Sequence, residues 1–177
     1  MMAAVAPHLV LVRHAATQPD PDRPARDWPL TDDGGRAAEA LAARLAHGRI
    51  GLVISSDEPK AAATAAPIAV ARGLTVTHDD RLREADRPWL EDGYDEAAAR
   101  WLDGDPLDGW ELLDAVRSRM WDATRARDAD LVAVTHGLAL TALVTAIDPA
   151  IDGPSFWRAL LFPDVVVVDG GRVGKPG

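Results

Sequence analysis

The chain has 177 residues, 47% of them hydrophobic, with 19 basic and 28 acidic side chains, a formal net charge of −9 and no cysteine. This length favours a single domain (residues 1–177) with a sizeable core. The lack of cysteine excludes disulfide scaffolds and thiolate sites, and it fits a cytoplasmic location. The acidity argues against nucleic-acid partners and by itself disfavours anionic substrates, and no apolar run approaches the ~20 residues of a membrane helix.

The first part of the chain predicts two strands separated by a loop and a helix. The apolar run at residues 8–13 indicates a buried strand, and the proline-rich residues 15–30 indicate a loop. Thr31 is placed as a helix N-cap, since apolar residues follow it at helical spacing, and Gly48 is expected to end that helix. A second short strand is expected at residues 52–55.

The next helix is expected to begin at Pro59, because proline suits the first helical turn, and to stop at Gly73. Pro67 lies inside this helix and predicts a break or a kink, because proline removes a backbone donor. A third strand is expected at residues 74–77. The sequence after it is mixed in character, with one short helix expected near residues 95–102.

The last part of the chain alternates helices and strands. Apolar residues at helical spacing predict a helix at 110–127, the run LVAVT predicts a strand at 131–135, and a helix is expected at 137–147. Residues 155–161 are ambiguous, and the valine run at 165–168 predicts a final strand. This alternation indicates an α/β domain with a largely parallel sheet.

Reactive side chains follow several of these strands. The first strand ends in Arg13 and His14, and the fourth is followed by His136. Lys60 lies one turn into the helix after the second strand, and Glu84 lies in the loop after the third. Taken singly, such residues are more often packing, capping or surface groups. Because the carboxyl ends of parallel strands meet at one edge of a sheet, their joint placement indicates a shared site.

This set of residues fits an anion site better than other chemistries. Arg13 and Lys60 would repel a metal ion, and the sequence has no Walker A, GxGxxG or GxSxG motif. Two cations and two imidazoles can instead hold phosphoryl oxygens. A neutral imidazole can attack phosphorus, and a carboxyl group can protonate the departing oxygen.

Five blocks of the sequence resemble the histidine phosphatase superfamily, the phosphoglycerate-mutase-like group, in order and spacing. They are LVLVRHAAT (9–17), PLTDDGGRAAEAL (29–41), SSDEPKAAATA (55–65), LREAD (82–86) and VAVTHG (132–137). The resemblance implies a three-layer α/β/α sandwich with a mostly parallel central sheet. It also implies a covalent phosphohistidine intermediate and no metal or other cofactor.

The resemblance also implies roles for individual residues. His14 would be the nucleophile that accepts the phosphoryl group, while Arg13 and His136 would bind the phosphoryl oxygens. Glu84 would be the general acid for the leaving group and then the base that activates water. Thr17 would line the pocket.

Two positions depart from the family pattern, and one residue competes for a role. Ala15 stands where the family has glycine, which adds a methyl group and disfavours positive φ. Lys60 stands where the family usually has arginine, and as one of only two lysines it is interpreted as a phosphate ligand without the planar fork of arginine. Asp86 could reach the same crevice as Glu84, which is favoured because it occupies the family's Leu-x-Glu position.

These features favour a phosphatase that acts on a phosphomonoester, either a small metabolite or a phosphohistidine on a protein. A phosphoglycerate-type mutase and a catalytically weak phosphate-binding or interaction domain stay open as alternatives. Residues 86–110 are the one candidate for a small lid of the kind mutases use, although core packing is the preferred interpretation of their three tryptophans. Members of the family often dimerise, so a homodimer stays an open alternative for this chain.

Overall fold

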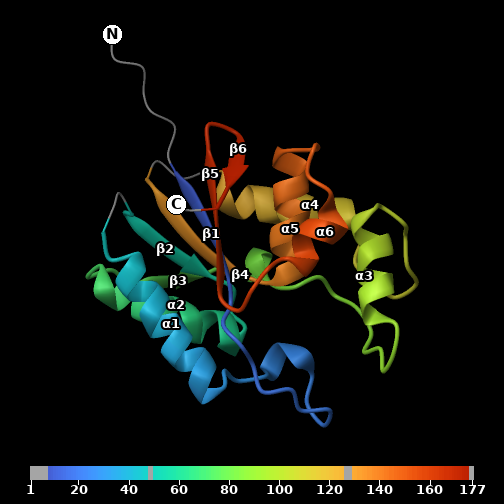
Figure 1. The fold of residues 1–177 in the computed structure, drawn as a ribbon, viewed down its shortest axis with the longest axis horizontal. Helices are drawn as coiled ribbons and strands as arrows, with labels where there is room; N and C mark the ends of the chain where they lie inside the picture. The colour runs from blue at the N-terminus through green and yellow to red at the C-terminus, as the bar shows by residue number, and fades with distance from the viewer. Residues whose placement is uncertain (1–7, 48–49, 126–128, 176–177) are drawn as a thin grey trace.

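The computed structural model describes residues 8–47, 50–125 and 129–175. Within these ranges one six-stranded sheet has the strand order β3-β2-β4-β1-β5-β6 (Figure 1). β1 to β4 run parallel, whereas β5 is antiparallel to β1 and β6 is antiparallel to β5. The strands are β1 Leu9–Arg13, β2 Leu52–Ser55, β3 Val76–His78, β4 Leu131–Thr135, β5 Asp164–Asp169 and β6 Arg172–Gly174.

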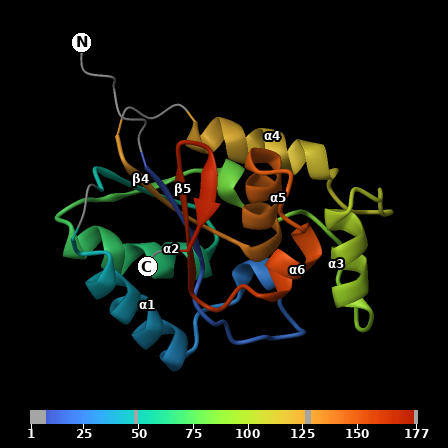
Figure 2. The same cartoon turned by 45° about the horizontal axis from the view of Figure 1, so that its top comes forward.

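Helices cover both faces of the sheet, which confirms the predicted α/β fold with a mostly parallel sheet (Figures 1 and 2). α1 and α2 pack on one face, α4 and α5 pack on the other, and α3 and α6 contact α5 and each other. The helices are α1 Asp32–Arg44, α2 Pro59–Ala71, α3 Tyr94–Leu102, α4 Leu113–Thr124, α5 Gly137–Ile147 and α6 Gly153–Arg158, with short 3-10 helices η1 Ala25–Asp27 and η2 Asp80–Leu82.

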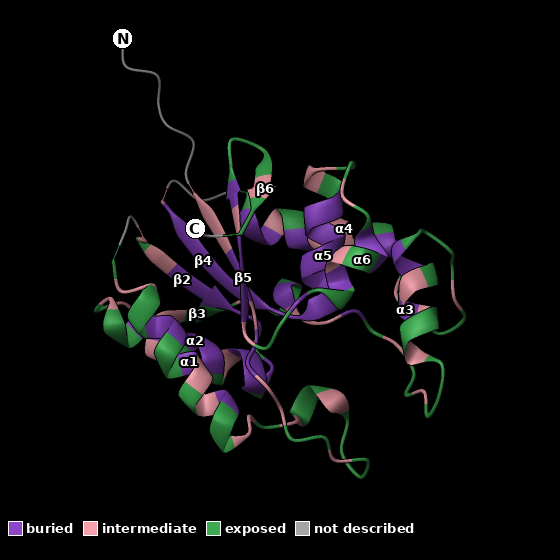
Figure 3. Ribbon diagram, viewed as in Figure 1, coloured by how far each residue is buried: buried purple, intermediate pink, exposed green. Residues whose placement is uncertain are grey.

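The two layers of helices share the strands because successive side chains of a strand point to opposite faces. In β1, Leu11 packs with the α3–α6 layer and Val12 packs with α1 and α2. β4 is buried along its whole length and α5 is buried from Gly137 to Thr145, as Figure 3 shows. Burial on all sides explains why neither element contains a charged residue. No helix of the described residues is long and apolar enough to cross a membrane.

Several elements differ from the sequence predictions. The prediction of a break at Pro67 is wrong, because α2 continues through this residue to Ala71. Proline removes only one backbone donor, and the buried alanine-rich face of α2 packs against the sheet and α1 on either side of it. β3 lies at Val76–His78 rather than 74–77, the ambiguous segment 155–161 contains the end of α6, and β6 was not predicted.

The first turn of α1 packs tightly against the loop after β1. Thr31 accepts a hydrogen bond from the Gly34 N–H at 2.9 Å and donates its own N–H to the Ala16 carbonyl at 3.0 Å. A Cβ on Gly34 would overlap that carbonyl oxygen. We therefore expect Gly34→Ala to lower the free energy of unfolding by about 2–3 kcal/mol.

Gly35 provides the matched control, because a Cβ at this position of the same helix would meet no atom within 4 Å. Gly35→Ala should leave the free energy of unfolding unchanged or raise it by up to about 1 kcal/mol. Urea unfolding of the two variants measures the difference. Equal free energies of unfolding for both variants would show that a Cβ close to the Ala16 carbonyl does not destabilise the fold.

Candidate active site

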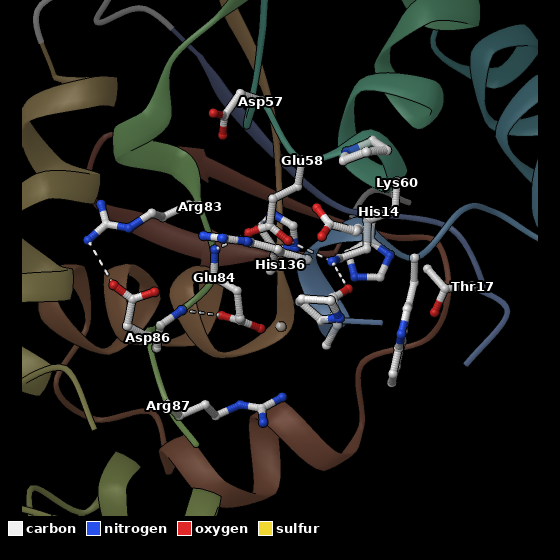
Figure 4. A pocket seen from close by; sticks show the side chains of 18 of the residues that line it. His14, Thr17, Asp57, Glu58, Lys60, Arg83, Glu84, Asp86, Arg87 and His136 are labelled. Atoms are coloured by element: carbon white, nitrogen blue, oxygen red, sulfur yellow. Dashed lines mark hydrogen bonds and ion pairs between the residues drawn. The ribbon is translucent and has the colours of Figure 1, made fainter. Parts of the chain in front are cut away.

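A crevice of about 840 Å³ lies where β1, β2 and β4 end (Figure 4). Its walls come from the loop after β1, the start of α2, the loop after η2 and the start of α5. The parallel sheet therefore brings together segments that are far apart in the sequence. Every residue predicted for the site lines this crevice, namely Arg13, His14, Thr17, Lys60, Glu84 and His136.

His14 follows β1 directly and is 7% exposed. Its backbone N–H donates to the Thr135 carbonyl at 2.9 Å, which extends the β1–β4 pairing by one residue. Its Nδ1 lies 2.7 Å from the Ala15 carbonyl oxygen. Because a carbonyl oxygen only accepts hydrogen bonds, Nδ1 carries the proton and the Nε2 lone pair is left unprotonated. Burial is the main cause that holds the pKa of His14 well below its usual 6.5, and nearby positive charge adds to it. The neutral form of the ring is therefore favoured.

The loop after His14 accommodates the change from glycine to Ala15 without backbone strain. Glycine is the only residue type with positive φ among the described residues, so Ala15 has an ordinary conformation. Its N–H donates to the Thr64 hydroxyl at 3.0 Å, and that hydroxyl donates to the Lys60 carbonyl at 2.7 Å. Thr17 pairs through its backbone with Leu30. These contacts tie the loop to α2 and to the entry of α1.

His136 is the N-cap residue of α5 and is fully buried. Its ring centroid lies 5.1 Å from that of His14. Nε2 lies 3.3 Å from Glu58 Oε1, but neither ring nitrogen forms a hydrogen bond with any described residue. Burial, followed by the charge of Lys60, holds the pKa of His136 well below 6.5. A buried donor without a partner is costly, so this ring is suited to an incoming acceptor such as a phosphoryl oxygen.

Arg13 is held by contacts on its face and on one edge. Its guanidinium carbon lies 3.5 Å from the centroid of the Phe162 ring, and Nη1 donates to the Leu160 carbonyl at 2.8 Å. Nε is buried without a partner among the described residues. An added Cβ on Gly137 would lie 3.2 Å from Arg13 Cζ, which explains why glycine follows His136. The arginine is therefore fixed in place and still has donors for an anion.

The carboxylate of Glu84 lies at the N-terminus of α5. It accepts the N–H of Leu138 at 3.2 Å and that of Ala139 at 2.9 Å, and a helix N-terminus favours such an anion. The Asp86 side chain is 73% exposed and lies 3.6 Å from Arg83 on the rim. Both carboxylates line the crevice, but Glu84 is the one anchored beside His136 (Figure 4).

Lys60 forms a buried ion pair that the sequence analysis missed. Its Nζ donates to Glu58 Oε2 at 2.6 Å and to the Ala25 carbonyl at 2.7 Å, and the two charged residues are 6% and 8% exposed. Glu58 Oε1 also accepts the backbone N–H of Glu84 at 2.9 Å. The lysine therefore keeps one N–H for a ligand, and a neighbouring carboxylate balances its charge.

Other crevice residues also escaped the sequence analysis. Glu58 is the N-cap residue directly before α2, where a carboxylate is ordinarily in solvent, so no local signal marks it as buried. Arg87, Tyr94 and Phe162 also line the crevice, but they come from loops and a helix start that no strand–helix pattern connects. Only the tertiary packing of α3 and of the segment after α6 brings them to the site.

The tryptophans of the 86–110 segment divide between two environments. Trp101 and Trp110 are buried in the core, as the packing interpretation expects. Trp89 is 58% exposed and meets Trp28, which lines the crevice, edge-on at a ring distance of 5.8 Å. This segment is therefore anchored by two of its tryptophans while its start contributes to the crevice wall.

The two buried histidines predict a stability that falls in mild acid. Since folding lowers the pKa of both His14 and His136, the unfolded chain binds more protons below about pH 6.5. Stability is then lost as pH falls, by up to about 2.7 kcal/mol per pH unit for two groups. Urea unfolding between about pH 7.5 and 5.5, above the main range of carboxylate titration, measures this slope. His14→Ala should roughly halve it, and a flat profile would contradict neutral burial of the two rings.

Comparisons with known proteins agree on one family. The sequence model of the histidine phosphatase superfamily (branch 1) matches residues 9–166. A Cronobacter sakazakii protein named "Probable phosphoglycerate mutase GpmB" is 36% identical over 157 residues, covering 77% of this chain and 73% of that protein. The structure of Bacillus stearothermophilus YhfR matches with a TM-score of 0.75 and 25% identity, over 96% of this chain and 95% of the other. A mycobacterial glucosyl-3-phosphoglycerate phosphatase shares the fold, with a TM-score of 0.73 and 22% identity over 91% of this chain and 89% of the other.

Proposed function

Since the chain belongs to the histidine phosphatase superfamily, we propose that it hydrolyses phosphomonoesters through a covalent phosphohistidine on His14. The observation that carries this proposal is the bond between His14 Nδ1 and the Ala15 carbonyl at 2.7 Å. It leaves Nε2 with the lone pair in a crevice that also contains Arg13 and Lys60. A buried neutral imidazole beside two cations is an activated nucleophile for a phosphoryl group.

In the first step, His14 Nε2 attacks phosphorus and the bond from phosphorus to the leaving oxygen breaks. Arg13 and the ring of His136 donate hydrogen bonds to the phosphoryl oxygens, and Lys60 adds its remaining N–H. Glu84 gives a proton to the leaving oxygen, and the monoanionic form of the substrate supplies that proton on binding. The products are an alcohol and phosphohistidine.

In the second step, water attacks the phosphorus of the phosphohistidine from the side that the alcohol has left. The Glu84 carboxylate accepts a proton from that water as the bond between nitrogen and phosphorus breaks. Inorganic phosphate is released and His14 Nε2 regains its lone pair. The same carboxylate thus serves as acid and then as base.

The substrate class is a small phosphorylated metabolite or a phosphohistidine on a protein. A crevice of about 840 Å³ falls within the range of small-molecule sites, so it has room for an organic group beyond the phosphoryl group. The test is phosphate release from a panel of phosphorylated metabolites, run beside the His14→Ala protein. Release by the wild type alone supports the proposal. Phosphate binding without turnover of any panel member or aryl phosphate would favour a binding domain instead.

A mutase is the second candidate, because curated relatives at 33–36% identity carry the name "Probable phosphoglycerate mutase GpmB". A mutase returns the phosphoryl group to the substrate, whereas a phosphatase gives it to water. Incubation with 3-phosphoglycerate and catalytic 2,3-bisphosphoglycerate separates the two. Interconversion of phosphoglycerates without phosphate release would replace our proposal, and hydrolysis without interconversion would remove the mutase.

A further inference from the structure

The basic side chains that line the crevice differ in their partners. Lys60 is paired with Glu58, and Arg83 is paired with Glu111 at 3.3 Å. Arg13 donates to a backbone carbonyl beside the phosphoryl site. Arg87 is half-buried, and no carboxylate of the described residues forms an ion pair with it. A half-buried guanidinium without a counter-charge needs an explanation, because leaving such a group unpaired is costly.

Two aromatic rings hold Arg87 in place. Its guanidinium carbon lies 4.2 Å from the centroid of the Tyr94 ring and 5.8 Å from that of Trp110. Its Nε is buried and has no hydrogen-bond partner among the described residues. Stacking on an aromatic ring occupies the face of a guanidinium and leaves its N–H edge for a planar anion.

Tyr94 does not neutralise Arg87. Burial, followed by the charge of Glu84, raises the pKa of Tyr94 to about 12, so its phenol is uncharged at neutral pH. The acidic residues Asp57 and Glu58 lie on the opposite side of the site from Arg87, and Glu58 is paired with Lys60 (Figure 4). Glu84 and Asp86 lie on the same side as Arg87 (Figure 4), but Glu84 accepts N–H groups of α5 and Asp86 lies beside Arg83, and no ion pair joins either carboxylate to Arg87 among the described residues.

Arg87 also lies where the leaving group of a substrate would be. It follows Glu84 by three residues, and Figure 4 shows Glu84 between Arg87 and the two histidines. If Glu84 protonates the leaving oxygen, the organic group attached to that oxygen extends past Glu84 toward Arg87. We propose that Arg87 is a specificity residue that binds a second anionic group, carried by the leaving group of the substrate. This inference rests on the proposed phosphatase function.

The test uses phenyl phosphates that carry a carboxylate at the ortho, meta or para position, each compared with its uncharged carboxamide. Phenyl phosphate is the reference, and phenylene bisphosphates distinguish a second phosphate from a carboxylate. The wild type should prefer the charged member at one or more positions by about tenfold or more in kcat/KM, as a charge-assisted bidentate contact provides. Arg87→Gln should bring that ratio close to one, and Arg87→Lys should keep part of it.

Arg26 is the matched control, because it also lines the crevice with no ion pair to a described residue, but it is exposed. Arg26→Gln removes the same charge and should keep the wild-type preference. The inference is overturned if the wild type shows no preference at any ring position, if Arg87→Gln retains it, or if Arg26→Gln loses it equally.

Binding measurements separate this inference from the proposed function. Calorimetric titration of the His14→Ala protein with the same charged and uncharged pairs needs no turnover. A preference for the charged member that disappears in the His14→Ala, Arg87→Gln double variant supports Arg87 even if no substrate is hydrolysed. Hydrolysis by the wild type without any preference in rate or binding would reject Arg87 and leave the phosphatase function standing.

Discussion

Alanine in place of His14 is expected to lower kcat for phosphomonoester hydrolysis by about 10,000-fold or more, the scale seen when a covalent nucleophile is removed. Without the imidazole, water must attack the phosphorus directly. Arg13, Lys60 and His136 would still bind the phosphoryl group, so KM should change far less than kcat. Steady-state hydrolysis of an aryl phosphate measures both constants.

His78→Ala is the control for this variant, because His78 is exposed at the end of β3 and does not line the crevice. Substrate carrying labelled phosphate should give the wild type an acid-labile, base-stable label that His14→Ala lacks. Thermal unfolding checks that the loss of a buried ring leaves the fold intact. A folded His14→Ala protein that hydrolyses within tenfold of the wild type would remove the phosphohistidine mechanism.

The position of the candidate site could be predicted from local patterns in the sequence. The runs before His14 and His136 contain too many apolar residues for surface segments, so they predict buried strands. Buried strands that alternate with helices pair in parallel, and their carboxyl ends must then share one edge. The parallel register of β1 and β4 places Arg13 opposite Thr135, the residue before His136. No long-range information was required for this part of the prediction.

The partners of Lys60 required information that no local pattern contains. Glu58 and Lys60 bracket Pro59 at the start of α2, where both side chains would ordinarily be solvated. Their burial depends on Ala25, which is 35 residues away and accepts a hydrogen bond from the lysine at 2.7 Å. A loop without periodicity places that carbonyl, so the sequence indicates a lysine near the proposed phosphate site but does not indicate its ion pair.

The ion pair between Lys60 and Glu58 also affects how much positive charge is available to bind an anionic substrate. A net charge of −9 disfavours anions in general, and the sequence predicted that Arg13 and Lys60 would overcome this locally. In the structure Glu58 balances Lys60, so less positive charge remains at the proposed phosphoryl site. We infer that recognition depends more on Arg13 and on the ring of His136, whose nitrogens have no hydrogen-bond partner among the described residues, because directed donors act at short range whatever the net charge.

Glutamine in place of Glu84 is expected to give a loss that depends on the leaving group. With an alkyl phosphate, kcat/KM should fall about 100- to 10,000-fold, the usual contribution of a general acid, because an alkoxide leaves poorly without a proton. With p-nitrophenyl phosphate the leaving oxygen needs little protonation, so phosphorylation of His14 should stay fast. Hydrolysis of the phosphohistidine should be slow with either substrate, because the base that activates water is missing.

Rapid mixing of Glu84→Gln with p-nitrophenyl phosphate should therefore release a burst of about one p-nitrophenol per active site, followed by slow turnover. Asp86→Asn is the matched control, since it removes a carboxylate from the rim, 3.6 Å from Arg83, without changing the contacts of Glu84 at α5. It should show neither the burst nor the dependence on the leaving group. Equal losses with both leaving groups in Glu84→Gln, or a burst in Asp86→Asn instead, would assign the proton transfers to a carboxylate other than Glu84.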